Sequence, residues 1–217
     1  MNPEFWHSKW EKNEIGFHLK SVHPLLKKFL PQVSVKPNAK VFVPLCGKTL
    51  DIGYLLQQGF DVVANELNNL AVEQLFTDLG LTPEISKWQG GQCYRHVNLT
   101  IWTGDYFSLS QEQLGKVDWV YDRAALIALP ESMREQYALQ MQNITCNAPQ
   151  LLIALDYDQS VMAGPPFSVA EQEITRHYQD NYKIELLSRK DIIEHEAKFA
   201  SRGLSSMFES VYALTAK

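Results

Sequence analysis

Residues 44–49, PLCGKT, are the first place in the chain where residue types and spacing suit a ligand. They follow the apolar run 41–43, which predicts a buried strand, and ligands of open α/β sheets bind beyond the carboxyl ends of the strands. GKT is half of a phosphate loop, but the first glycine of that motif would stand where the chain has Phe42. A dinucleotide fingerprint also fails, because Gly47 is the only glycine here. The segment favours a cofactor without phosphate, of which S-adenosylmethionine is the commonest; a plain strand-to-helix turn is the alternative.

Acidic residues follow the next two expected strands. Glu66 stands 19 positions after Gly47, the spacing at which a carboxylate accepts hydrogen bonds from a ribose diol. A solvated carboxylate at a strand end is the alternative explanation. Asp105, with Tyr106 beside it, follows the third expected strand and is placed to accept a hydrogen bond from an adenine amino group. An Asx turn would explain the same aspartate.

Arg123 follows the strand expected at 117–121. A guanidinium at a strand's carboxyl end can clamp the carboxylate of a methyl donor or steady an anionic acceptor. A surface ion pair with Asp122 is the alternative. No Ser/His/Asp constellation, paired carboxylates or metal-ligand spacing accompanies it. We therefore predict no catalytic acid–base residue and no metal site.

Composition and charge exclude several classes of protein. Lys and Arg number 20 against 25 Asp and Glu, a formal charge of −5 without any basic stripe. Nucleic acid is therefore not expected as a partner, because phosphate binding needs concentrated positive charge. The three cysteines have neither zinc nor disulfide spacing, the start lacks a signal peptide, and no apolar run is long enough to cross a membrane. We expect a cytoplasmic monomer that acts on a small molecule.

The candidate residues need a scaffold that brings strand ends together. Strands are predicted at 41–43, 62–64, 99–102, 117–121 and 151–155, and helices at 50–56, at 72–79 and from Pro130 onward. A hairpin is expected within 84–98, a capping box at 168–171, and an antiparallel pair from 182–187 and 208–215. The expected fold is α/β: a doubly wound, mostly parallel sheet with helices on both faces and an antiparallel edge pair.

Six segments together resemble the thiopurine S-methyltransferase family, in particular its bacterial members. They are FWHSKWEKNEIGFHL at 5–19, VFVPLCGKTLDIGYL at 41–55, ANEL at 64–67, YDRAALIALP at 121–130, GPPFSV at 164–169 and FESVYALT at 208–215. The resemblance covers nearly the whole chain, and its first two segments are specific. It implies a single domain, 1–217, of the Rossmann-like class I methyltransferase fold, with 1–36 as a flap over the active site and 39–217 as the α/β core.

The resemblance also implies S-adenosylmethionine as methyl donor and four donor contacts. Trp10 would pack on the donor, Leu45 would contact it from the first loop, Glu66 would hold the ribose hydroxyls, and Arg123 would lie at donor and acceptor. The aromatic face of Trp10 would stabilise the sulfonium and exclude water. Ordinary helix packing of Trp6 and Trp10 is the alternative. Asp105 and Tyr106 match adenine-contacting positions.

On the acceptor side, Phe17 and His18 match residues that line the flap. An arginine that steadies the acceptor in animal enzymes aligns with Lys198, and Arg202 is a possible substitute. The implied reaction is methyl transfer to the sulfur of a small aromatic or heterocyclic thiol. Selenium or tellurium species and halides are alternative acceptors, and a non-catalytic nucleotide-binding module is the alternative from another class.

Overall fold

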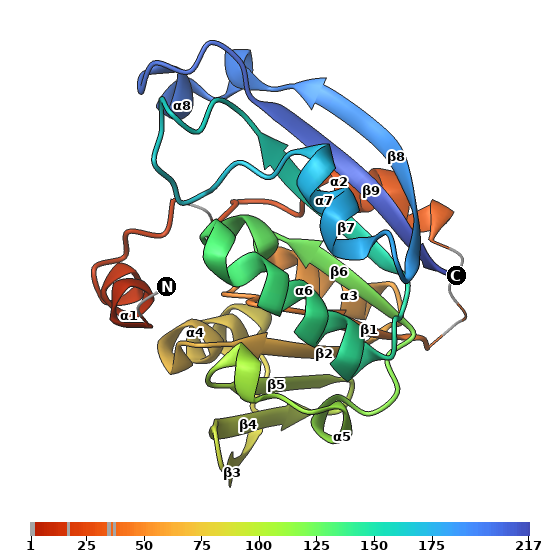
Figure 1. The fold of residues 1–217 in the computed structure, drawn as a ribbon. Helices are drawn as coiled ribbons and strands as arrows, with labels where there is room; N and C mark the ends of the chain where they lie inside the picture. The colour runs from red at the N-terminus through yellow and green to blue at the C-terminus, as the bar shows by residue number, and fades with distance from the viewer. Residues whose placement is uncertain (1–2, 17, 34–35, 37) are drawn as a thin grey trace. The chain divides into compact units, whose positions relative to one another are not determined.

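The computed structural model describes residues 3–16, 18–33, 36 and 38–217. The chain divides into two compact units, Met1–Trp119 and Val120–Lys217. Both contain strands and helices in alternation (Figure 1). In the described part of the chain, no helix is long and apolar enough to cross a membrane.

The first unit is built on a five-stranded sheet in the order β3-β4-β5-β2-β1. Its strands are β1 (Lys40–Val43), β2 (Asp61–Glu66), β3 (Glu84–Trp88), β4 (Gly91–His96) and β5 (Leu99–Thr103). β1 and β5 run parallel to β2. The hairpin of β3 and β4 adds to β5 in the antiparallel direction, so the predicted insertion extends the sheet (Figure 1).

Helices follow β1 and β2 where the sequence predicts them: α3 (Leu50–Gln57) and α4 (Asn69–Leu79). The unit also contains α1 (Pro3–Glu11), α2 (Pro24–Phe29) and α5 (Gln111–Leu114), with 3-10 turns η1 (Leu30–Gln32) and η2 (Tyr106–Ser108). The apolar face predicted for α4 is buried at Val72, Leu75 and Phe76. Gly80 ends this helix in the left-handed conformation, φ +66°, where a residue without Cβ is unstrained.

The second unit begins around β6 (Trp119–Arg123) and has the strand order β6-β7-β9-β8. The remaining elements are η3 (Leu126–Ala128), α6 (Glu131–Thr145), β7 (Gln150–Asp156), α7 (Glu171–Tyr178), β8 (Tyr182–Asp191), η4 (Ile193–His195), α8 (Ala197–Ala200) and β9 (Phe208–Ala216). β6 and β7 are parallel, and β9 is antiparallel to both β7 and β8. The antiparallel pair predicted for the tail is therefore confirmed.

The capping box predicted at 168–171 is wrong. α7 begins at Glu171, and its N-cap, Ala170, makes no side-chain cap. The Ser168 hydroxyl instead accepts a hydrogen bond from the Tyr157 N–H at 2.9 Å. The serine thus ties the segment before α7 to the residue that follows β7, a tertiary role that a local sequence pattern does not reveal.

Candidate active site

The loop after β1 is held in one conformation by hydrogen bonds to the end of β2. The Cys46 N–H donates to the Asn65 carbonyl at 2.8 Å, and the Gly47 N–H donates to Glu66 Oε2 at 2.7 Å. Leu45, φ +43°, and Gly47, φ +54°, both adopt left-handed backbone. A left-handed leucine costs about 1–2 kcal/mol, and such strain is concentrated at functional sites. The sequence-predicted donor contact Leu45 therefore lies in a turn shaped by tertiary contacts.

The remaining residues of the GKT sequence serve the scaffold. Lys48 Nζ lies 3.7 Å from the Asp78 carboxylate of α4. The Thr49 hydroxyl accepts the Asp51 N–H and caps α3. Both observations agree with the prediction that this loop is not a phosphate loop.

Glu66 is buried, with 6% of its surface exposed. Besides the bond from Gly47, its Oε1 accepts the Asn68 N–H at 3.0 Å. Burial raises the pKa of this carboxyl, while hydrogen bonds from backbone N–H groups, led by those of Asn68 and Gly47, act in the opposite direction. Since a carboxylate has about four acceptor positions, the bonds from Gly47 and Asn68 leave Glu66 lone pairs for further donors. The alternative of a solvated strand-end carboxylate is wrong.

Trp10 of α1 packs against the same loop. Its side chain is 4% exposed, and a Cβ placed on Gly47 would lie 3.2 Å from its Cζ2 atom. α1 is fixed further by a hydrogen bond between Asn68 Nδ2 and His7 Nδ1 at 3.0 Å. The structure thus brings Trp10, Leu45 and Glu66 together around one loop. Trp10 is buried against this loop, so packing and donor contact are compatible roles for it.

Replacing Gly47 by alanine should loosen α1 and weaken donor binding several-fold. Alanine at a left-handed position is strained, and its Cβ also presses on the Trp10 ring. Gly80→Ala is the matched control, because Gly80 has φ +66° but no atom within 4 Å of its would-be Cβ. Calorimetric titration with S-adenosylhomocysteine measures the difference. Equal affinities in the two variants would show that the contact between Trp10 and Gly47 is irrelevant to the donor.

The end of β5 is held by Asn65 and by the β3–β4 hairpin, neither of which the sequence predicts as part of the site. The fully buried Asn65 donates from Nδ2 to the carbonyls of Trp102, at 3.0 Å, and Gly104, at 3.1 Å. A Cβ on Gly104 would lie 2.2 Å from the Gly90 carbonyl oxygen. The tip of the β3–β4 hairpin therefore rests on the backbone that leads into Asp105.

Asp105 forms the Asx turn that was the alternative to an adenine contact. Its Oδ1 accepts the Phe107 N–H at 3.1 Å and caps η2. The side chain is exposed, whereas Tyr106 is buried. The turn leaves Asp105 Oδ2 to a ligand, so the two roles do not exclude each other.

In the second unit, Arg123 ends β6 and is half-buried. Its neighbour Asp122 is fully buried and accepts hydrogen bonds from the Tyr137 hydroxyl at 2.7 Å and the Leu126 N–H at 3.3 Å. Successive side chains on a strand point to opposite faces. The alternative of a surface ion pair between Arg123 and Asp122 is therefore wrong. Ala124, φ +60°, turns the chain directly after Arg123.

Burial raises the pKa of Asp122 to about 6, although its hydrogen bonds from Tyr137 and Leu126 lower it. Ionising this carboxyl above that pH opposes folding, because the folded-state value lies above the 3.8 of an exposed aspartate. Asp122 is thus retained at some expense of stability. Its two hydrogen bonds link the turn that carries Arg123 to α6.

The segment that follows β7 meets the turn that follows β6. The Phe167 N–H donates to the Ile127 carbonyl at 2.7 Å, and the Tyr157 hydroxyl donates to the Pro166 carbonyl. Within this unit, the GPPFSV segment therefore lies against the turn beyond Arg123. Both segments follow the carboxyl ends of parallel strands, where ligands of this type of sheet bind.

Of the two cations suggested for the acceptor side, Arg202 contacts the loop after β7. Its Nη1 lies 3.6 Å from Met162 Sδ. Lys198 is exposed on α8, with its ammonium 5.9 Å from the Phe199 ring centre. His18 is half-buried, and Phe17 lies outside the described residues.

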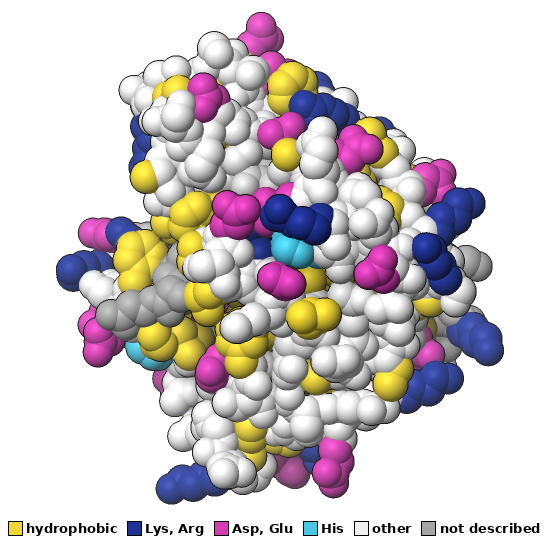
Figure 2. Space-filling view, viewed as in Figure 1, with side chains coloured by type: hydrophobic (Ala, Val, Ile, Leu, Met, Phe, Trp, Pro, Cys, Tyr) yellow, Lys and Arg dark blue, Asp and Glu magenta, His cyan; other side chains and the backbone are white. Residues whose placement is uncertain are grey.

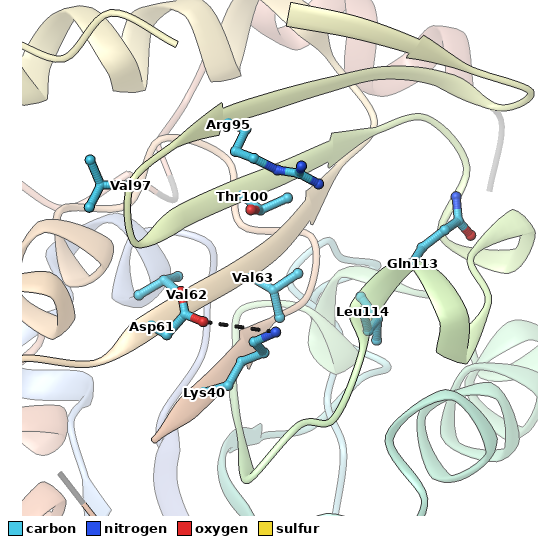
Figure 3. Close-up of a pocket in the computed structure, with 9 residues that line it drawn as sticks. All are labelled: Lys40, Asp61, Val62, Val63, Arg95, Val97, Thr100, Gln113 and Leu114. Atoms are coloured by element: carbon cyan, nitrogen blue, oxygen red, sulfur yellow. Dashed lines mark ion pairs between the residues drawn. The ribbon is translucent and has the colours of Figure 1, made fainter. Parts of the chain in front are cut away.

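Two cavities lie away from these residues. One, of about 240 Å³, is at the amino-terminal end of β1 and β2, where Lys40 and Asp61 pair at 3.8 Å (Figure 3). The other, of about 390 Å³, lies in the second unit beside the buried ion pair of Arg134 with Glu173. Neither is lined by Trp10, Leu45, Glu66 or Arg123. The first is at the wrong end of the parallel strands for a cofactor of this fold.

Charge and ligand types agree with a small-molecule site. On the face shown in Figure 2, Lys and Arg side chains are dispersed among acidic and uncharged ones. Among the residues whose positions are described, no group of three His, Cys, Asp or Glu side chains is arranged to hold a metal ion.

Sequence reasoning missed Asn68 and His7. Asn68 precedes the apolar repeat of α4, so its type predicts an N-cap, but its bonds to Glu66 and His7 are tertiary. His7 stands one helical turn before Trp10. This spacing places both side chains on one side of the helix, and it was the only indication in the sequence that His7 would contact the donor loop's surroundings.

Comparison with known proteins places this geometry in a family. The sequence model described as thiopurine S-methyltransferase (TPMT) matches residues 1–217. The thiopurine S-methyltransferase of Shewanella pealeana is 43% identical over 218 residues, covering 100% of both chains. That of Pseudomonas fluorescens is 42% identical over 214 residues, covering 99% of each chain.

Solved structures show the fold. The 1,6-didemethyltoxoflavin-N1-methyltransferase of Burkholderia thailandensis, solved with 1,6-didemethyltoxoflavin and S-adenosylhomocysteine, aligns with a TM-score of 0.63 at 12% identity, over 98% of this chain and 87% of that one. A TehB-like SAM-dependent methyltransferase of Corynebacterium glutamicum aligns with a TM-score of 0.56 at 15% identity, over 99% and 98%. The class I methyltransferase fold is confirmed.

The family match also confirms the prediction that the chain is an S-methyltransferase and that S-adenosylmethionine is its methyl donor. This chain belongs to the thiopurine S-methyltransferase family.

Proposed function

We propose that the chain methylates the sulfur of small aromatic or heterocyclic thiols, using a donor site built from Trp10, Leu45 and Glu66. The observation that carries the donor site is the network in which Glu66 accepts the N–H groups of Gly47 and Asn68. It fixes a buried carboxylate at the end of β2, where a ribose diol binds in open α/β sheets. Arg123, at the end of β6, clamps the donor's carboxylate or favours the anionic acceptor.

The mechanism needs positioning more than acid–base chemistry. S-adenosylmethionine supplies an electrophilic methyl group on a positively charged sulfur. The chain's own residues hold donor and acceptor in line, which accounts for a large part of the rate of such a displacement. Trp10 excludes water and offers an aromatic face to the positive charge. A heterocyclic thiol that ionises more readily than the cysteine reference of about 8.5 needs no dedicated base.

The test compares matched acceptors in a labelled-methyl assay. We expect thiols to be methylated while phenols and alcohols of the same shape are not, and activity to persist with EDTA, because a thiolate needs no metal to become nucleophilic. The donor should also raise the melting temperature, since ligand at 100 times its dissociation constant adds about 2.7 kcal/mol. NADH and ATP should not. Preference for a phenol over its thiol analogue would refute the acceptor class, and selenite, tellurite and halides belong in the panel as alternative acceptors.

The remaining proposals concern organisation and location. Residues 1–36 act as a flap on one domain, 1–217, because α1 docks on the donor loop through Trp10 and His7. The protein acts as a cytoplasmic monomer without a nucleic-acid partner; its free Cys46, Cys93 and Cys146 are compatible with a reducing compartment. Light scattering and cell fractionation test these statements. A dimer or an exported protein would contradict them.

A further inference from the structure

Asn68 is held in a single orientation by the start of α4. Its Oδ1 accepts the Leu70 N–H at 2.8 Å as the helix N-cap. Its own N–H donates to Glu66 Oε1, and the residue is 5% exposed. Because the cap uses the amide oxygen, the group that faces His7 is the amide nitrogen, Nδ2.

The hydrogen bond to His7 therefore has a fixed direction. An amide nitrogen only donates, so His7 Nδ1 must accept. An accepting ring nitrogen carries a lone pair, which only the neutral imidazole has, since both nitrogens of the protonated ring are donors. The contact at 3.0 Å thus assigns His7 the tautomer whose proton is on Nε2.

His7 and Trp10 fix α1 at two points that meet at the same carboxylate. They are three residues apart and so lie on one side of the helix. Trp10 packs on Gly47, and His7 bonds to Asn68. The N–H groups of Gly47 and Asn68 are the ones that donate to Glu66. The docking of α1 and the position of the Glu66 carboxylate therefore depend on the same two backbone segments.

We propose that His7 and Asn68 form a latch that holds α1 closed on the donor site. His7 and Asn68 are positioning residues, acting through Trp10 and Glu66. The latch rests on the proposed donor site for its effect on affinity. Its effect on α1 itself does not depend on that site.

The first test uses the protein without ligand. Amide hydrogen exchange of α1 should be several-fold faster in His7→Ala than in the parent, because the helix loses its hydrogen bond to Asn68. His7→Asn should restore protection, since its Oδ1 stands where Nδ1 of His7 does and accepts the same hydrogen bond. Ser8→Ala, the neighbouring change on the same helix, should exchange like the parent. Unchanged exchange in His7→Ala would overturn the latch.

The second test follows affinity for S-adenosylhomocysteine by calorimetry. We expect His7→Ala to bind it about fivefold more weakly than the parent, the effect of one hydrogen bond. His7→Asn, whose amide oxygen can accept from Asn68, and Ser8→Ala should bind it like the parent.

Equal affinities of His7→Ala and the parent would overturn the effect of the latch on the donor site. If Trp10→Ala and Glu66→Gln bind S-adenosylhomocysteine as the parent does, the donor-site proposal fails instead. The exchange experiment then still decides whether His7 anchors α1.

Discussion

Glu66→Gln should bind S-adenosylhomocysteine about 10- to 150-fold more weakly than the parent. The substitution removes the charge from the group that accepts the ribose hydroxyls, and hydrogen bonds to a charged group contribute about 1.5–3 kcal/mol. It also places an amide NH₂ where one of the two backbone N–H groups, from Gly47 or Asn68, now finds an oxygen. That N–H loses its acceptor, so the melting temperature should fall as well.

Glu84→Gln is the control, because Glu84 is an exposed carboxylate on β3 of the same unit. It should leave both affinity and melting temperature unchanged. Glu66→Ala is less informative, because it deprives both backbone groups of their partner and disturbs the loop. Affinity of Glu66→Gln within twofold of the parent would mean that Glu66 serves the loop alone and that the ribose binds elsewhere.

The pH dependence of donor binding follows from the same carboxylate. Burial raises the pKa of Glu66 above 4.5 in the folded protein. Ribose hydroxyls donate to the ionised form, so affinity should fall as the pH falls through this raised value, and binding below it should release a proton. Calorimetry in buffers of different ionisation enthalpy detects that proton, and Glu66→Gln should lack it.

Arg123→Ala should lower kcat/KM by about 10- to 150-fold for acceptors that react as thiolates. A guanidinium that pairs with an anion contributes about 1.5–3 kcal/mol through charge-assisted hydrogen bonds. Folding should be unaffected, because Arg123 is only half-buried. The buried hydrogen bond to Tyr137 is made by its neighbour Asp122, which the substitution leaves in place. Rates measured with an acidic heterocyclic thiol and a weakly acidic alkyl thiol at one pH separate an effect on acceptor charge from an effect on the donor.

Arg123→Lys distinguishes charge from geometry. Lysine keeps the positive charge but loses the planar fork, so partial recovery indicates that charge dominates. Arg176→Ala is the control, because Arg176 is an exposed arginine of the same unit, paired with Glu131 at 3.4 Å. An equal loss for both thiols, accompanied by weaker S-adenosylhomocysteine binding, would assign Arg123 to the donor's carboxylate.

Much of the fold was predictable because its signals are local. Apolar runs locate β1, β2, β5 and β7, and the i, i+3, i+4 spacing at Val72, Leu75 and Phe76 identifies the buried face of α4. The tail pair was predictable from alternation alone. The capping box at 168–171 failed because Ser168 has a tertiary partner, Tyr157, that competes with the local cap.

The sequence by itself determined which strand ends carry ligand-binding residue types: Leu45, Glu66, Asp105 and Arg123 each follow an expected strand. Only the tertiary structure decided what those residues do. Glu66 is buried and binds two backbone N–H groups instead of being solvated, and Asp122 bonds to Tyr137 and not to Arg123. The physical reason is that burial and hydrogen-bond partners depend on segments far apart in the chain, as for His7 and Asn68, which are 61 residues apart.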